Sequence, residues 1–222
     1  MMGSPEDEKK RLKHEGPMHE VYVDGFWMGK FPVTQKEWEL IMGENPSVFK
    51  SGDRYPVENV SWKKCQAYIQ QLNTRSKHTF RLPTEAEWEY ACRAGTTTPF
   101  YFGKTITTDQ ANYNGNYPYA DSKKGIYRKK TTPVDQFKPN AFGLYDMHGN
   151  VWEWCEDFFD EKAYQKHAER NPVIQDGGSD RVLRGGCWRY DAWDLRSANR
   201  GRSYPGDRRN STGFRLLENL DP

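Results

Sequence analysis

Three segments in the first half of the chain place apolar side chains at the spacing of an amphipathic helix. In the first and third segments a threonine is followed three residues later by a glutamate, which is the pattern of a capping box: Thr34 with Glu37, and Thr84 with Glu87. The second segment begins at Ser61, another residue that commonly caps helices. The pattern therefore predicts three helices, over residues 34–42, 61–72 and 84–91.

The rest of the chain has the pattern of strands and loops. Residues 21–28 alternate apolar and polar side chains and predict a strand. Helical spacing disappears after Thr96, and residues 112–127 and 137–156 predict long loops with short aromatic strands between them. Residues 181–216 predict a hairpin-like pair of strands around a long polar excursion.

Composition favours one α+β domain that is rich in loops. Apolar residues make up only 35% of the chain, but aromatic residues make up 14%. Each aromatic side chain buries about 150–250 Å², so a few of them can replace many aliphatic ones in a core. No internal repeat or linker interrupts the chain, and we therefore expect residues 1–222 to form one domain.

Charge and hydropathy exclude several classes of partner. The formal net charge of +2 lacks the basic excess of a typical nucleic-acid-binding domain. No apolar run approaches about 18 residues, so no membrane span is expected. No signal peptide is visible, which predicts a cytoplasmic protein. The charged stretch 6–11 predicts a solvated, mobile terminus.

The four cysteines are far apart in the sequence and form no paired motif. Cysteines with metal-binding or redox roles usually occur in close pairs, so zinc is not expected. A disulfide framework is also not expected in a chain of this length. We predict reduced and mostly buried thiols at Cys65, Cys92, Cys155 and Cys187.

Six motifs, in order along nearly the whole chain, resemble the formylglycine-generating-enzyme-like family, also called sulfatase-modifying factors. The resemblance implies an α+β, C-type-lectin-like fold that is low in regular secondary structure. The motifs are Met2–Glu6, Pro32–Thr34, Pro56–Trp62, Arg81–Glu89, Asn140–Trp154 and a final set made of Arg184–Gly186, Arg196–Ala198, Arg200 and Gly213–Arg215.

The resemblance also implies chemistry that this chain lacks. Enzymes of the family oxidise a substrate cysteine with copper held by two cysteines just after the Arg-Gly-Gly turn, and thiolates suit monovalent copper. Here that stretch contains only Cys187, which stands before the first catalytic position, while Tyr190 stands near it. We therefore expect no copper and no such oxidase activity. The alternative is an enzyme with an altered site that uses Cys187 alone or another metal.

A carboxylate-containing turn is the candidate metal site. Calcium takes six to eight oxygen ligands, from carboxylates and backbone carbonyls. In the resembling family this stretch binds structural calcium, and the matching ligands are the side chains of Asp146 and Glu153 and the carbonyls of Gly149 and Val151. The alternative is that Asp146 caps a turn while Glu153 pairs with an arginine.

Residues 187–212, here called the binding segment, mix side chains that are typical of binding surfaces. Tyrosine, tryptophan and arginine dominate binding hot spots, and small polar residues adapt to varied ligands. The segment resembles the variable region of diversity-generating-retroelement proteins, and the alternative is an ordinary polar loop. Both the pattern and its width favour a protein or peptide ligand over a small molecule. The candidate ligand-binding residues are Arg189, Tyr190, Asp191, Trp193, Asp194, Ser203, Tyr204, Asp207 and Arg209.

Overall fold

The computed structural model describes residues 1–220. All three predicted helices are present, as α1 (Gln35–Met42), α2 (Trp62–Arg75) and α3 (Glu85–Arg93). Both predicted capping boxes form, and Ser61 caps α2 through the backbone N–H of Lys64. Two short 3₁₀ turns, η1 (Lys13–Glu15) and η2 (Ala192–Leu195), and the short helix α4 (Ala163–Lys166) complete the helical elements.

Seven strands form two small sheets. One sheet has the order β1-β7-β2 and is antiparallel. The other has the order β5-β4-β3-β6, with β6 parallel to β3 and the remaining pairs antiparallel. The strands are β1 (Phe26–Met28), β2 (Phe80–Arg81), β3 (Trp152–Phe158), β4 (Arg181–Arg184), β5 (Gly201–Ser203), β6 (Thr212–Gly213) and β7 (Leu217–Asn219).

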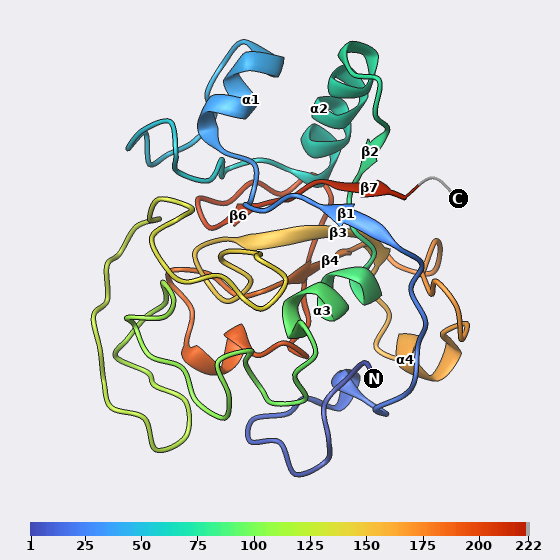
Figure 1. Cartoon of the computed structure of the whole chain (residues 1–222), viewed down its shortest axis with the longest axis vertical. Coiled ribbons are helices and arrows are strands. Elements are labelled where there is room, and N and C mark those ends of the chain that lie inside the picture. Colours follow the sequence, from blue (N-terminus) through green and yellow to red (C-terminus); the bar gives the residue numbers. More distant parts are fainter. Residues whose placement is uncertain (221–222) are drawn as a thin grey trace.

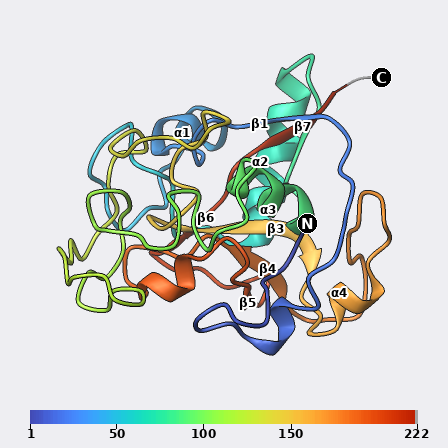
Figure 2. The same cartoon turned by 60° about the horizontal axis from the view of Figure 1, so that its bottom comes forward.

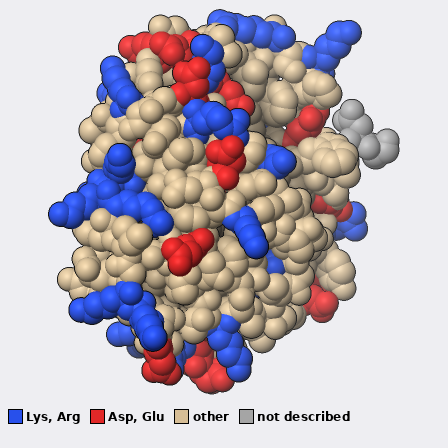
Figure 3. Space-filling view, turned by 60° about the vertical axis from the view of Figure 1, so that its left-hand side comes forward, with Lys and Arg blue, Asp and Glu red and all other residues tan. Residues whose placement is uncertain are grey.

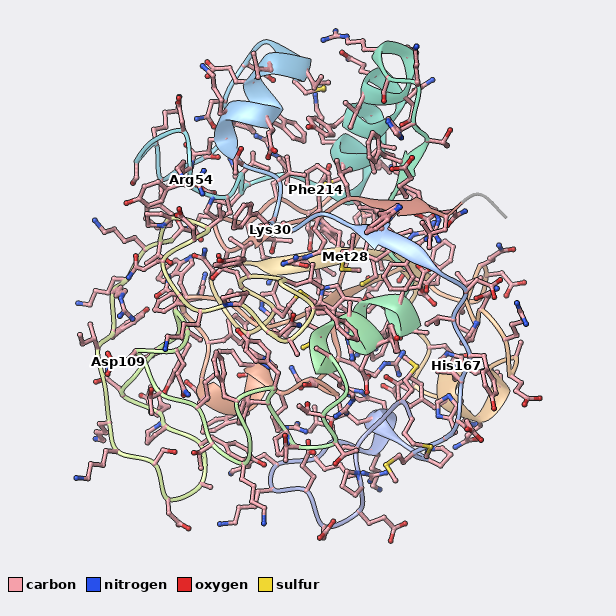
Figure 4. All side chains as sticks on the ribbon, viewed as in Figure 1. Met28, Lys30, Arg54, Asp109, His167 and Phe214 are labelled. Carbon is pink, nitrogen blue, oxygen red and sulfur yellow. The ribbon has the colours of Figure 1, made fainter. Side chains whose placement is uncertain are left out.

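The four-stranded sheet separates two parts of the core. Successive side chains of a strand point to opposite faces, so Trp154 packs with Leu183 towards α1 and α2, while Cys155 packs with Val182 towards α3. In Figure 1, α1 and α2 accordingly lie on one side of the strands and α3 on the other. Phe214, labelled in Figure 4, lies below the helices, and its ring meets those of Trp38 and Tyr68 edge to face.

Three predictions about the strands were partly wrong. The predicted strand 21–28 is regular only over Phe26–Met28. The longest strand, Trp152–Phe158, begins inside the segment that was predicted as a loop. Its side chains are almost all buried because both faces are covered, so the alternation that marks a half-exposed strand is missing. The end of the chain forms three strands of the four-stranded sheet instead of one pair.

The charged stretch 6–11 is not a solvated terminus throughout. The side chain of Glu8 is only 3% exposed, and its Oε1 lies 2.6 Å from Nη1 of Arg196. Glu15 is fully buried and accepts two further hydrogen bonds from Arg196, of 2.6 and 2.7 Å. The N-terminal segment, blue in Figure 2, crosses beside β5, where Nη1 of Arg200 donates to the carbonyl of His14. It therefore packs against the framework of the binding segment.

Candidate functional site

A pocket of about 200 Å³ opens within the binding segment. Four of the nine predicted ligand-binding residues line it: Arg189, Tyr190, Asp194 and Arg209. Trp152 of β3 contributes an aromatic wall, and its ring meets that of Tyr190 edge to face at 5.7 Å. A pocket that combines an aromatic wall with a few polar groups is the usual form of a ligand-binding site.

Buried framework residues hold the exposed residues of the segment in place. Gly186 has a φ of 72°, and a Cβ there would lie 2.6 Å from the Leu195 side chain, so this turn requires glycine. Trp188 is buried and donates from its indole to the carbonyl of Asn210, 3.0 Å away. The two ends of the segment are thus tied together, and Arg189 and Tyr190 between them are exposed.

The other five predicted residues lie outside the pocket lining. Tyr204 is exposed, while Asp191, Trp193 and Asp207 are partly buried. Ser203 is buried, and its hydroxyl donates to Oδ2 of Asp207 at 2.7 Å. The same carboxylate oxygen lies 3.3 Å from Nη2 of Arg209. Ser203 can therefore act on a ligand only indirectly, by positioning Asp207.

The carboxyl of Asp194 is the acidic group within the pocket lining. Burial, together with the nearby charge of Asp191, raises its pKa to about 6. Arg200 also belongs to the lining but is buried and held by Glu85. The arginines that face outward are Arg189, Arg202 and Arg209, which are exposed.

Sequence reasoning missed a second loop that belongs to this surface. The N–H of Asn114 donates to the carbonyl of Tyr190 at 2.9 Å, and the N–H of Ala192 donates to the carbonyl of Tyr117 at 3.1 Å. Tyr127 stacks on Trp188 with ring centroids 6.3 Å apart. Residues 112–127 were predicted only as a long loop, and no local pattern in the sequence indicates that they pair with the binding segment.

The thiol at position 187 lies in poor surroundings for metal chemistry. Cys187 is completely buried, and burial raises the pKa of its thiol to about 12. Thiolates are the ligands of copper, so a raised pKa disfavours metal binding. The other three cysteines are also free and buried, as predicted.

His148, in the turn before β3, makes a structural pair of hydrogen bonds. Its Nδ1 lies 2.7 Å from the carbonyl of Leu195, and its Nε2 accepts from the N–H of Tyr101 at 3.0 Å. Burial lowers the pKa of this imidazole to about 3, so the ring is neutral. Both ring nitrogens of His148 thus have backbone partners, which tie the turn before β3 to Tyr101 and Leu195.

The residues predicted to bind calcium lie at the start of β3. Asp146 is buried with Asn150 as a neutral partner 3.0 Å away, and burial raises the pKa of its carboxyl to about 8. Such a carboxylate suits a cation, because a cation would compensate its buried charge. The Glu153 carboxylate has fewer free lone pairs for a metal ion, because Arg215 binds both of its oxygens and Trp88 donates to Oε2. Oε1 accepts only one of these bonds and could still share a cation.

No group of three or more histidine, cysteine, aspartate or glutamate side chains that could hold a metal occurs in residues 1–220. Calcium therefore stays a prediction. Its ligands would be the Asp146 carboxylate, the carbonyls of Gly149 and Val151, and Oε1 of Glu153, which accepts one hydrogen bond from Arg215. The pairing of Glu153 with an arginine, which was the alternative to calcium, is present through Arg215.

Calcium removal should lower the thermal stability of the protein. Saturation of one site at about 100 times its Kd adds about 2.7 kcal/mol, so a chelator should lower Tm by about 5–10 °C. Asp146→Asn should abolish this difference, whereas Asp53→Asn, which changes an exposed carboxylate paired with Lys36, should keep it. Identical melting curves of the unmodified protein with calcium and with chelator would show that the predicted calcium site is wrong.

The fold combines two small sheets with a pocket that is lined mostly by residues 187–212. The sulfatase-modifying factor enzyme 1-like domain matches residues 1–220, and the chain belongs to this family. The formylglycine-generating enzyme of Mus musculus is 31% identical over 206 residues, which cover 89% of this chain and 52% of that protein. The serine/threonine-protein kinase pkn1 of Chlamydia caviae is 32% identical over 239 residues, which cover 94% of this chain and 35% of the kinase.

The chain thus spans about a third of the kinase and about half of the enzyme. Among solved structures, Treponema denticola variable protein 1 superimposes with a TM-score of 0.83 at 28% identity, over 99% of this chain and 92% of that one. PvdO from Pseudomonas aeruginosa gives a TM-score of 0.84 at 30% identity, over 99% and 90%. The α+β, C-type-lectin-like fold expected from the sequence resemblance is confirmed. No helix within the described residues has the length and apolar character of a membrane span.

Proposed function

We propose that this chain is a non-catalytic ligand-binding protein that displays residues 187–212 on a rigid lectin-like scaffold, as variable proteins of diversity-generating retroelements do. The observation that carries the proposal is the pocket itself, where exposed Arg189 and Tyr190 stand on a buried framework beside Trp152. Binding residues are commonly held on loops that a rigid scaffold positions. The likeness to a variable protein over 99% of the chain supports the same use of the segment.

The alternative is an oxidase related to formylglycine-generating enzymes, which the family membership favours. The burial and the raised pKa of Cys187 argue against it. If the purified protein bound monovalent copper stoichiometrically and Cys187→Ser abolished that binding, the non-catalytic proposal would be wrong.

Truncation of the pocket residues should weaken ligand binding strongly. A display library of peptides and small domains selected on the unmodified protein supplies the ligands. Arg189→Ala combined with Tyr190→Ala should lower their affinity by about 30-fold or more, because hot-spot residues contribute about 2 kcal/mol or more. The measurement is titration calorimetry or surface plasmon resonance.

The matched control is Trp27→Ala, which removes an aromatic ring that is 67% exposed on β1, outside the binding segment. This variant should bind the selected ligands with unchanged affinity. If Trp27→Ala lowered the affinity and the change at Tyr190 did not, the ligand-binding surface would lie elsewhere.

Diversification of the segment has its own test in the neighbouring DNA. A reverse-transcriptase gene and a near-copy of codons 187–212 that differs only at adenines should be found there, and absence of such a repeat would exclude diversification.

A further inference from the structure

A basic loop is joined through Tyr127 to residues that contact the binding segment. Residues 122–131 contain five lysines and arginines and no acidic residue, and the group comprises Lys123, Lys124, Arg128, Lys129 and Lys130. Its four lysines are exposed, and none of them forms a salt bridge with the described residues. Arg128 is partly buried and donates to the carbonyl of Thr108, so it anchors the loop. The basic loop therefore presents a local excess of positive charge to the solvent, directly after the exposed Asp121, which pairs with Lys9.

Backbone contacts join this loop to the binding segment. Tyr127 pairs with Asn114 in a short β-bridge, and Asn114 donates to the carbonyl of Tyr190. The Tyr127 ring lies against Trp188, next to Arg189. The basic loop is thus attached to the stretch of chain that supplies Arg189 and Tyr190 to the pocket. The face that comes forward in Figure 3 carries several separate groups of lysine and arginine side chains, with smaller groups of aspartate and glutamate between them.

The outward-facing arginines of the pocket are weakly paired. Arg189 forms no ion pair or hydrogen bond through its side chain with residues 1–220. Arg202 lies 3.6 Å from Glu161 and 3.9 Å from Asp180, and its side chain is half exposed. Arg209 has one contact of 3.3 Å to Asp207, also at half exposure. Exposed pairs of this kind are worth about 0–1 kcal/mol, so a ligand carboxylate can compete for the guanidinium groups.

We propose that the ligand of this surface is a protein or peptide with an acidic segment, which the basic loop attracts and the arginines of the pocket bind. This inference rests on the proposed binding function and names the chemistry of its partner. Arginine binds carboxylates through two parallel hydrogen bonds. Clustered surface charge increases the association rate with partners of opposite sign. The pocket, at about 200 Å³, has room for one or two side chains of such a segment.

An acidic peptide fits the surface better than a nucleic acid does. Asp194 lines the same pocket as the arginines and lies within the electrostatic influence of Asp191, and Asp207 lies beside Arg209. A nucleic acid carries a charge at every phosphate and would meet these carboxylates. A peptide can place its carboxylates opposite the arginines and its N–H groups opposite the aspartates.

The probe is a fluorescent peptide rich in glutamate and tyrosine, compared with the same peptide carrying glutamine in place of glutamate. Single-stranded DNA of equal net charge is the third probe. Anisotropy titrations with the full chain should show that the glutamate peptide binds more tightly than both others. Its affinity should fall as salt rises, because the screening length shrinks from about 30 Å at 0.01 M to about 8 Å at 0.15 M.

Two variants with opposite expected effects on affinity make the test specific. Lys123→Glu with Lys124→Glu should lower the affinity for the glutamate peptide about tenfold, as expected when two rim charges are reversed at about 1 kcal/mol or less each. Asp194→Asn should raise it, because it removes a carboxylate from the pocket. The charge-matched control is Arg75→Glu with Lys77→Glu at the far end of α2, which should leave the affinity unchanged.

Equal affinity for the glutamate and glutamine peptides, or tighter binding of DNA, would overturn the acidic-partner proposal. Equal effects of the loop variant and its control would do the same. The proposed function would survive these outcomes if ligands selected from the library still required Arg189 and Tyr190. The proposed function would itself be wrong if the selected ligands bound without Arg189 and Tyr190.

Discussion

Glu85→Gln should destabilise the protein by about 3–5 kcal/mol, because it removes one charge from a buried ion-pair network. Glu85 is fully buried at the first residue of α3. Its Oε1 lies 2.6 Å from Nε of Arg200 and 3.1 Å from Nη1 of Arg184, and its Oε2 lies 2.7 Å from Nη2 of Arg200. Glutamine keeps the volume but leaves Arg200 without its charge partner.

The network also contains a group that should report on the change. Burial, followed by the charge of Glu85, raises the pKa of Asp157 to about 7. An acid with a raised pKa contributes stability at low pH that is lost as the pH rises through the folded value. Without the charge of Glu85 this loss should be smaller. The destabilisation by Glu85→Gln should therefore be larger near about pH 5 than near about pH 8.

The measurement is urea unfolding followed by tryptophan fluorescence. Asp135→Asn is the matched control, because it removes a carboxylate from an exposed pair in which Arg54 and Asp135 are 58% and 45% exposed. This control should cost no more than about 1 kcal/mol. A similarly small effect of Glu85→Gln would mean that the buried network contributes little to stability.

The same network explains why the binding segment can carry exposed residues without losing its shape. Arg184 binds both Glu85 and Glu89 and donates to the carbonyls of Ser197 and Ala198. Arg196 is held by Glu8 and Glu15 of the N-terminal segment. The fixed arginines therefore act from below the surface, while Arg189 and Tyr190 project from it. Substitution at the exposed positions leaves these contacts intact.

Local signals in the sequence were sufficient to predict the helices. A cap such as Thr84 acts on N–H groups within its own first turn, so its effect is visible in a few neighbouring residues. The strands were harder to predict, because Trp152–Phe158 is covered on both faces and its side chains do not alternate between buried and exposed. The burial of Glu15 could not be predicted, since its partner Arg196 lies 181 residues away.

The candidate site was predictable in part for the same reason. Arg189, Tyr190, Asp194 and Arg209 belong to one stretch of sequence with the composition of a binding surface, and they do line one pocket. Trp152 and the basic loop reach that surface through contacts between distant segments, which composition cannot reveal. Ser203 was included because small polar residues are common in binding loops, and only the structure shows that it is buried under Asp207.

Arg215→Met should cause a loss of about 3–5 kcal/mol, because it leaves Glu153 buried without its cation. Both residues are fully buried, and Nε and Nη2 of Arg215 each lie 2.7 Å from a different oxygen of Glu153. Arg215 also donates to the carbonyls of Gly29 and Tyr145, which would lose their donors. Arg215→Lys keeps the charge but cannot make all four contacts, so its loss should be intermediate.

Unfolding of Arg215→Met in calcium and in chelator also tests the metal prediction. If Glu153 shares a calcium ion with Asp146, calcium should restore part of the lost stability, because a divalent cation would replace the missing positive charge. Asp146→Asn in the same background should remove that recovery. An equal loss in both media would exclude Glu153 from the calcium ligands, and its pairing with Arg215 would then account for its burial.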